Sequence, residues 1–173
     1  AQLTYDAIND LYQKACAQWP GVFEEPDIKL RKDHLQVCIG PVEPIRLLGS
    51  NLRIMDDAFE YLMPTEAKKK KGQFFTPRHV IEMCVRMLNP KEYEYVIDPS
   101  CGSGGFLLQS LAQMQEKSKK LKDPVQRHKF WHSFAEHNLY GIEISGGISR
   151  TAKMNMIIHD DGHTNVITHD GLD

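Results

Sequence analysis

The stretch that decides the fold is DPSCGSGGF, residues 98–106, which follows the β-rich run YEYVI at 93–97. Gly102, Gly104 and Gly105 lie within four positions there, and the apolar run FLLQSLAQM follows directly. Glycine has no Cβ, so it allows a positive φ and lets another molecule approach the main chain closely. We therefore predict a strand, a turn and a helix whose first N–H groups face a ligand. A tight turn that only packs the helix on the strand is the alternative.

Apolar spacing on both sides of this turn predicts an alternating order of strands and helices. We expect strands at 94–98, 139–143 and 165–169, and helices at 104–121, 125–138 and 148–159. A further helix is expected at 76–88, with Thr76 as its N-cap and Pro77 at its first helical position. The alternation after residue 93 indicates an α/β fold, in which helices pack on a parallel sheet.

The first third of the chain has a different pattern. Helical spacing of apolar residues predicts helices at 3–19 and 51–63. Residues 20–50 contain four prolines, and we expect loops there, with one or two short helices or an extended piece at HLQVCIG, 34–40. We therefore expect a mainly helical segment at 1–66 and an α/β part at 67–173.

The composition fits a globular domain and excludes several classes of protein. Of the 173 residues, 41% are apolar, which is enough for a packed core, and the net charge of −2 predicts no general attraction to nucleic acid or membranes. No apolar run approaches the roughly 18 residues of a membrane span, and no leader pattern is visible. The four cysteines are widely separated without a CxxC pair, so we expect reduced thiols in a cytoplasmic protein.

Acidic residues at two predicted strand ends indicate the class of ligand. The turn lacks the third glycine of the dinucleotide fingerprint, and Glu143 lies far beyond the roughly 20 residues at which that fingerprint places its acid. A phosphate loop would need a following Lys-Ser/Thr, which is also absent. Asp98 suits an ammonium group instead, and Glu143 can accept two hydrogen bonds from a ribose diol. This combination favours S-adenosyl-L-methionine over NAD or ATP.

The order of the motifs resembles a known family. GQFFTP at 72–77, DPSCGSGGFL, then GIE, RTAKMNM and finally DGL are similar to the modification (methyltransferase) subunit of type I restriction-modification systems, an adenine-N6 DNA methyltransferase family. The resemblance spans residues 52–173 and is weaker before them. It implies the first half of a Rossmann-like S-adenosylmethionine-dependent methyltransferase domain behind a mainly helical segment, and we expect this chain to be an N-terminal fragment.

The resemblance also implies a role for individual residues in binding the cofactor. The methionine end would be lined by Gln73, Phe74, Phe75, Thr76, Pro77 and Arg78. Asp98 would take the ammonium group, the turn residues Gly102, Ser103 and Gly104 would approach the methionyl and ribose parts, Glu143 would hold the ribose hydroxyls, and Asp170 would hold the adenine amine. Core packing for the two phenylalanines and a plain turn for Asp170 remain open. Gly146 and Gly147 depart from the family pattern, and we expect them to loosen the loop after Glu143.

The family's catalytic motif is missing from this sequence. The resembled enzymes hold the flipped adenine with an Asn/Asp-Pro-Pro-aromatic motif, because the target nitrogen is otherwise paired inside the duplex. Asn89-Pro90-Lys91 lacks the second proline and the aromatic residue, and Asp98-Pro99-Ser100 belongs to the glycine turn. We therefore assign no catalytic residue.

Other charged clusters carry weaker signals. The lysine run 68–71 is either a DNA phosphate contact or a solvated linker. Two sets of histidines, His128, His132 and His137, and His159, His163 and His169, are expected on exposed polar segments and not at a metal site.

The leading hypothesis is a site-specific DNA adenine-N6 methyltransferase that uses S-adenosyl-L-methionine. The resemblance implies DNA, a specificity subunit and a restriction subunit as partners, and no membrane. The alternative is a non-catalytic module that binds the cofactor or serves assembly. A nucleotide-dependent oxidoreductase is disfavoured by the missing third glycine.

Overall fold

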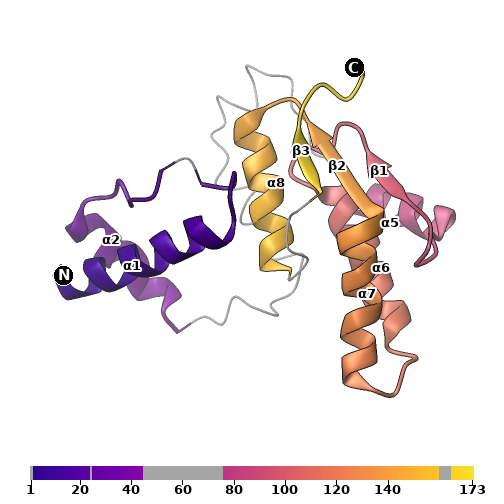
Figure 1. Cartoon of the computed structure of the whole chain (residues 1–173), viewed down its shortest axis with the longest axis horizontal. Helices are drawn as coiled ribbons and strands as arrows, with labels where there is room; N and C mark the ends of the chain where they lie inside the picture. Colours follow the sequence, from indigo (N-terminus) through magenta and orange to yellow (C-terminus); the bar gives the residue numbers. More distant parts are fainter. Residues whose placement is uncertain (1, 24, 45–75, 160–164) are drawn as a thin grey trace. The chain divides into compact units, whose positions relative to one another are not determined.

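The computed structural model describes residues 2–23, 25–44, 76–159 and 165–173. The chain divides into two compact units, residues 1–49 and 50–173. Figure 1 shows the two units, with the ribbon coloured by residue number. The predicted boundary between residues 66 and 67 and the predicted helix at 51–63 lie outside the described residues, so both stay predictions.

The first unit contains two packed helices, α1 (Gln2–Gln18) and α2 (Lys32–Val42). The first agrees with the helix expected at 3–19, whereas 34–40 is helical and not extended. The connection between them is held on α1, because the Tyr5 hydroxyl donates to the Ile28 carbonyl (2.8 Å) and the Ile28 N–H donates to Asn9 Oδ1 (2.9 Å). Its buried apolar side chains among the described residues are Val22 and Leu35, so this unit has a small core.

The second unit is an α/β layer built in the predicted order. After the helix α5 (Arg78–Leu88) come β1 (Val96–Asp98), α6 (Gly105–Ser118), α7 (Pro124–Asn138), β2 (Leu139–Glu143), α8 (Gly146–Ile158) and β3 (Val166–Thr168). The strands form a parallel sheet in the order β1-β2-β3, in which Asp98 pairs with Gly141 and Glu143 pairs with Thr168 (Figure 1). The carboxyl ends of the strands therefore meet at one edge, where the glycine turn lies.

Two helix starts differ from the prediction by two residues, and α6 ends at Ser118 and not at residue 121. Helix α5 begins at Arg78, and Pro77 is its N-cap in place of Thr76, because the N–H groups of Val80 and Ile81 donate to the Pro77 carbonyl. Helix α8 begins at Gly146 and not at residue 148. Both glycines that were expected to loosen a loop thus form the first helical turn.

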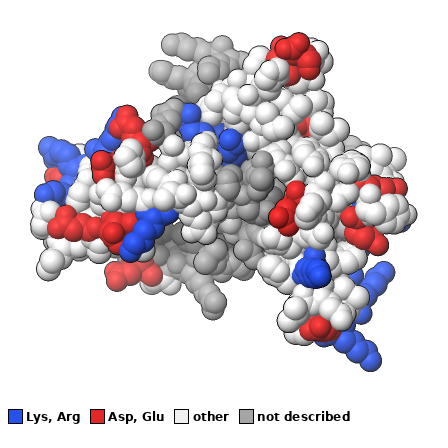
Figure 2. Space-filling view, viewed as in Figure 1, with Lys and Arg blue, Asp and Glu red and all other residues white. Residues whose placement is uncertain are grey.

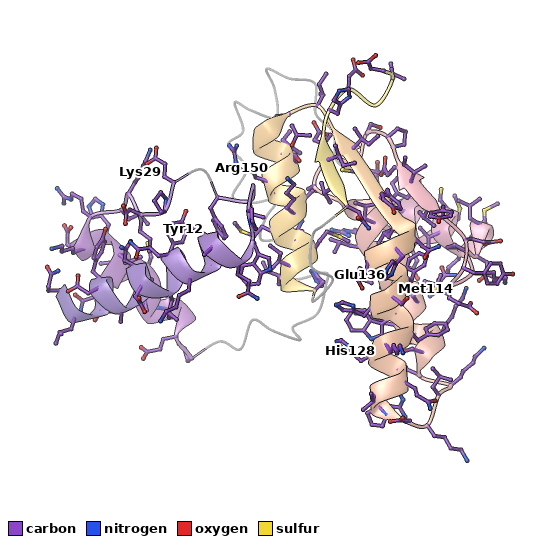
Figure 3. All side chains as sticks on the ribbon, in the orientation of Figure 1. Tyr12, Lys29, Met114, His128, Glu136 and Arg150 are labelled. Atoms are coloured by element: carbon purple, nitrogen blue, oxygen red, sulfur yellow. The ribbon has the colours of Figure 1, made fainter. Side chains whose placement is uncertain are left out.

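One face of the sheet carries the core. Its buried apolar cluster includes Leu107, Leu108, Leu111, Met114, Phe134, Leu139, Ala152, Met156 and Val166. Met114 on α6 is fully buried and points into this layer (Figure 3). The alternating strand positions Ile97 and Ile167 lie on the opposite face and remain 62% and 48% exposed. The described helices therefore cover one face of the sheet, whereas parallel sheets are usually covered by helices on both faces.

The middle strand is pressed against the turn and α6 at Gly141. A Cβ at this position would lie 2.6 Å from Leu107 Cδ1 and 3.0 Å from Cys101 Sγ. Real Cβ atoms do not approach other atoms so closely, so any other residue here would require the side chains of Leu107 and Cys101 to move. Glycine at 141 thus allows Leu107 and Cys101 to pack directly against the middle strand.

The face of the molecule shown in Figure 2 carries no single dominant charge over the described residues. On the face shown in Figure 2, lysine and arginine side chains are interspersed with aspartate and glutamate over the described residues, which agrees with the net charge of −2. None of the helices in the described ranges is both long enough and apolar enough to cross a membrane.

Candidate functional site

The glycine turn continues directly from the carboxyl end of β1. It is anchored to β2, because the Cys101 N–H donates to the Ile142 carbonyl (2.9 Å). Gly102 has φ +56° and Gly104 has φ +91°, two left-handed positions that favour glycine. A Cβ on Gly102 would meet no atom of the described residues within 4 Å, so those residues leave this side of the turn accessible to another molecule.

Glu143 closes the turn from the end of β2. Its side chain is only 7% exposed, and its carboxylate accepts from the Gly102 N–H at Oε2 (3.1 Å) and from the Ser145 N–H at Oε1 (2.8 Å). The same carboxylate therefore joins the loops that follow β1 and β2. Each carboxylate oxygen has a second lone pair, so both can still accept a bond from a ligand.

Asp98 is the second carboxylate at this edge. Burial raises the pKa of Asp98, the nearby charge of Glu143 raises it further, and a hydrogen bond from the Ser100 N–H (3.1 Å) opposes both. Among the described side chains, no cation forms an ion pair with either carboxylate. A site with two uncompensated carboxylates attracts a positively charged ligand rich in hydroxyl groups and repels a phosphate.

The surroundings of Cys101, near these two acids, disfavour its thiolate form. Burial, with added effects from Asp98 and Glu143, raises the pKa of its thiol to about 12. The thiolate is the reactive form of cysteine. Cys101 is therefore a neutral packing residue beneath the turn, and all four cysteines are free thiols.

Comparison with known proteins connects this geometry with a family. Residues 51–172 match the sequence profile described as N-6 DNA Methylase. The chain belongs to the N-6 DNA methylase family. The resemblance drawn from the motif order is thereby confirmed.

Several curated proteins are similar to this N-6 DNA methylase chain. The EcoKI methylase subunit of a type I restriction enzyme from Escherichia coli K12 is 32% identical over 110 residues, which are 60% of this chain and 20% of that protein. The MpnII methylase subunit from Mycoplasma pneumoniae is 31% identical over 155 residues, 84% of this chain and 26% of that protein. The chain thus spans only about a fifth to a quarter of the length of these relatives.

A solved structure supports the fold. A modification subunit of a putative type I restriction enzyme from Vibrio vulnificus YJ016 superposes with a TM-score of 0.54 at 23% identity, over 70% of this chain and 23% of that chain. The expected fold, the first half of a Rossmann-like methyltransferase domain after a mainly helical segment, is confirmed.

The structure brings the start of α5 to the glycine turn of this N-6 DNA methylase chain. A Cβ on Gly105 would lie 2.9 Å from Ile81 Cδ1, so the first turn of α5 packs on the first residue of α6. Thr76 and Pro77 are exposed next to this contact, and Arg78 is partly exposed. Gln73, Phe74 and Phe75 lie outside the described residues, and the roles of all six remain predictions.

The loop after β3 approaches the same edge. A Cβ on Gly171 would lie 1.9 Å from the Pro99 carbonyl oxygen, so the DGL segment packs directly on the Asp-Pro turn. Asp170 is exposed, and its Oδ1 accepts from the Leu172 N–H (3.0 Å). Its present contact is that of a turn residue, and its role at the adenine amine stays a prediction.

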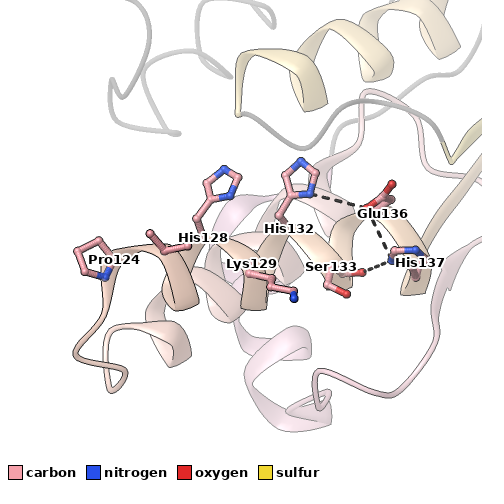
Figure 4. Close-up of a pocket in the computed structure, with 8 residues that line it drawn as sticks. Pro124, His128, Lys129, His132, Ser133, Glu136 and His137 are labelled. Carbon is pink, nitrogen blue, oxygen red and sulfur yellow. Dashed lines mark hydrogen bonds and ion pairs between the residues drawn. The ribbon is translucent and has the colours of Figure 1, made fainter.

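Histidines on α7 form a separate feature. An open pocket of about 610 Å³ is lined by Pro124, Val125, His128, Lys129, His132, Ser133, Glu136 and His137. His128 and His132 stack with ring centroids 5.1 Å apart, and Glu136 lies 3.9 Å from His132 Nδ1 and 3.8 Å from His137 Nδ1 (Figure 4). All the lining residues belong to one helix, and no group of three or more potential metal ligands is assembled within the described ranges.

Sequence reasoning missed Asn155, which contacts the turn from α8. It is fully buried, and its Nδ2 donates to the Ser103 carbonyl (2.9 Å). An asparagine at a core position of an amphipathic helix was the available signal, because a buried amide needs a partner.

Proposed function

We propose that this chain is the cofactor-binding part of a DNA adenine-N6 methyltransferase of a type I restriction-modification system, and that its cofactor is S-adenosyl-L-methionine. The observation that carries the proposal is the glycine turn flanked by Asp98 and Glu143, neither of which forms an ion pair with a cation of the described residues. The cofactor would supply a methyl group on a sulfonium for transfer to the adenine amine.

Each part of the site matches one part of the cofactor. Asp98 would accept from the ammonium group, whose positive charge offsets the unfavourable burial of this carboxylate. Glu143 would accept from the ribose hydroxyls while keeping its bonds to the two loops. The first N–H groups of α5 would receive the cofactor carboxylate, since a helix N-terminus favours negative charge.

The proposed substrate and partners follow from the relatives. They are named as methylase subunits of type I restriction enzymes, so we propose DNA as substrate and the specificity and restriction subunits of the same system as partners. The 173 residues hold no Asn/Asp-Pro-Pro-aromatic motif. We therefore propose that this segment binds the cofactor and does not itself hold the flipped adenine.

Calorimetric titration tests the choice of cofactor. The chain is titrated with S-adenosyl-L-methionine, NAD and ATP under the same conditions. We expect binding of the first alone, because the two carboxylates disfavour the phosphates of the others. Tight binding of NAD without a response to S-adenosyl-L-methionine would overturn the proposal.

A transfer assay tests the division of labour. The chain is incubated with methyl-labelled cofactor, adenine-containing duplex DNA and the specificity subunit. We expect no label at adenine N6, since misplacement of reacting groups by about 1 Å already costs on the order of a hundredfold in rate. The missing motif also favours the second candidate, a non-catalytic binding module. Label on the DNA would exclude that candidate and show that catalysis resides in these residues.

A further inference from the structure

Asn155 is a buried polar residue that the proposed chemistry does not use. Its side chain is 0% exposed on α8, and its single side-chain hydrogen bond within the described residues runs to the Ser103 carbonyl, 52 positions earlier. Its Oδ1 is buried without a hydrogen-bond partner there. Leaving one amide atom unpaired is unfavourable, so an apolar residue would serve packing alone better. The residue therefore calls for a role beyond packing.

The neighbours of Asn155 also contact the glycine turn. A Cβ on Gly104 would lie 3.7 Å from the Ala152 Cβ and 4.0 Å from the Met156 sulfur. Ala152 is fully buried and Met156 nearly so, and both lie on the same face of α8 as Asn155. This face of α8 supports the turn by packing at Gly104 and by a hydrogen bond at Ser103.

Hydrogen bonds engage both the N–H and the carbonyl in two of the three peptide units of the turn, whereas the Gly102–Ser103 unit has a bond at its carbonyl alone, from Cys101 Sγ (3.8 Å). In the Cys101–Gly102 unit, the carbonyl accepts from the Gly104 N–H (2.8 Å) and the N–H donates to Glu143. In the Ser103–Gly104 unit, the N–H is held by that same Cys101 carbonyl, and the carbonyl is held by Asn155. Between them, the Ser103 N–H has no partner among the described residues. It lies next to Gly102, whose outer side is open.

We propose that Asn155 is a positioning residue of this turn. It fixes the orientation of the Ser103–Gly104 peptide unit, while Glu143 holds the Gly102 N–H, so the Ser103 N–H between them remains available to donate to a ligand. Two left-handed glycines flank Ser103, so the intervening peptide units could otherwise rotate with little steric cost. A bond from a packed helix removes that freedom before the ligand arrives. As a statement about cofactor binding, the inference rests on the proposed function.

The test compares Asn155→Leu and Asn155→Asp with Ser149→Ala. Both substitutions at Asn155 keep the approximate volume; leucine removes the donor to Ser103, and aspartate removes it when its carboxyl group is ionised. Ser149 is a matched control, because it is equally buried on α8 and its hydroxyl accepts from Thr168 Oγ1 (2.8 Å) and not from the turn. Amide hydrogen exchange of the turn is measured by NMR without ligand, and the dissociation constant for S-adenosyl-L-methionine is measured by calorimetry.

We expect the Gly104 amide to exchange about tenfold faster in the Asn155 variants, the ratio for the loss of one hydrogen bond of ordinary strength. The amides of β2 should be unchanged, and the dissociation constant should rise by a similar factor. Ser149→Ala should leave the turn and the dissociation constant unchanged. Unaltered exchange at Gly104 in a folded Asn155 variant would overturn the inference.

The unsubstituted chain provides a second reading if neither Asn155 variant folds. The side-chain amide protons of Asn155 should then be protected from exchange, with a through-bond coupling between Nδ2 and the Ser103 carbonyl carbon. Exchange of these protons at the solvent rate would refute the positioning role. Failure of the unsubstituted chain to bind S-adenosyl-L-methionine would refute the proposed function instead, while the exchange data still decide whether Asn155 fixes the turn.

Discussion

Removal of the Glu143 carboxylate tests the cofactor site most directly. In Glu143→Ala, the N–H groups of Gly102 and Ser145 lose their acceptor, and the proposed contact with the ribose hydroxyls disappears. Glu143→Gln keeps one acceptor oxygen and loses the charge, so it should lie between the alanine variant and the unsubstituted chain.

The magnitude follows from the type of hydrogen bond. A bond to a charged group contributes about 1.5–3 kcal/mol, which corresponds to roughly a tenfold to 150-fold change in a dissociation constant. The two backbone bonds belong to the folded chain with or without ligand, so their loss lowers stability. Only the ribose contact should respond to a change in the ligand.

The assay separates these effects with two ligands. The dissociation constants of S-adenosyl-L-homocysteine and its 2′-deoxy analogue are measured by calorimetry for the unsubstituted chain, Glu143→Ala and the control Glu136→Ala, which removes an exposed acid from α7. The deoxy analogue should bind at least about tenfold more weakly to the unsubstituted chain and to the control. In Glu143→Ala the two ligands should bind almost equally. The same ratio in all three proteins would refute the assignment of the ribose to Glu143.

Three further predictions concern Asp98, the turn and the open sheet face. Because burial and Glu143 raise the pKa of Asp98, the folded state keeps this proton to a higher pH than the unfolded chain. The free energy of unfolding should therefore fall as the pH rises from the ordinary carboxyl pKa through the raised pKa of Asp98. Urea unfolding of Asp98→Asn over the same pH range should lack this part of the fall, and the variant should bind the cofactor more weakly. Identical pH profiles of the two proteins would contradict the assignment. Gly104→Ala should lower the free energy of unfolding by about 1–2 kcal/mol, because Gly104 has a left-handed φ. The control Gly147→Ala, in helix α8, should not destabilise the chain. Equal melting temperatures of the two variants would refute the argument. Ile97 on the edge strand β1 is exposed, so we expect the isolated chain to self-associate. Sedimentation should show less self-association for Ile97→Lys. A monomeric unsubstituted chain would refute this prediction.

Much of the second unit could be predicted, because its signals are local. The turn chemistry at 98–106 and the alternating apolar runs placed three parallel strands and the intervening helices within a few residues of their observed bounds. The first residues of helices α5 and α8 were predicted less accurately, because they depend on hydrogen-bond geometry and packing. Thr76 has the side chain of an N-cap, yet the Pro77 carbonyl receives the first helical bonds. Gly146 and Gly147 suggested a loop, although packing of α8 on β2 and β3 holds them in a helix.

The long-range contacts of the site could not be read from the sequence. The bond between Asn155 and Ser103 joins residues 52 positions apart, and the bond between Glu143 and Gly102 spans 41 positions. The strand order brings Asp98 and Glu143 to one edge of the sheet. The distances from the glycine turn to Glu143 and Asn155 depend on how closely α6 and α8 pack on the sheet. Gly141 permits that packing, and its role is visible only when Leu107 and Cys101 are seen against it.

The contacts that build the turn have a thermodynamic consequence for the whole second unit. Strands β1 and β2 and helix α8 each supply one side of it, so a chain in which any of them is undocked has no binding site. A ligand that requires this arrangement binds the folded state alone and draws the equilibrium toward it. At a free ligand concentration one hundred times the dissociation constant, this adds about 2.7 kcal/mol to the free energy of unfolding. If the chain is only marginally stable, part of its folded population would thus depend on the ligand.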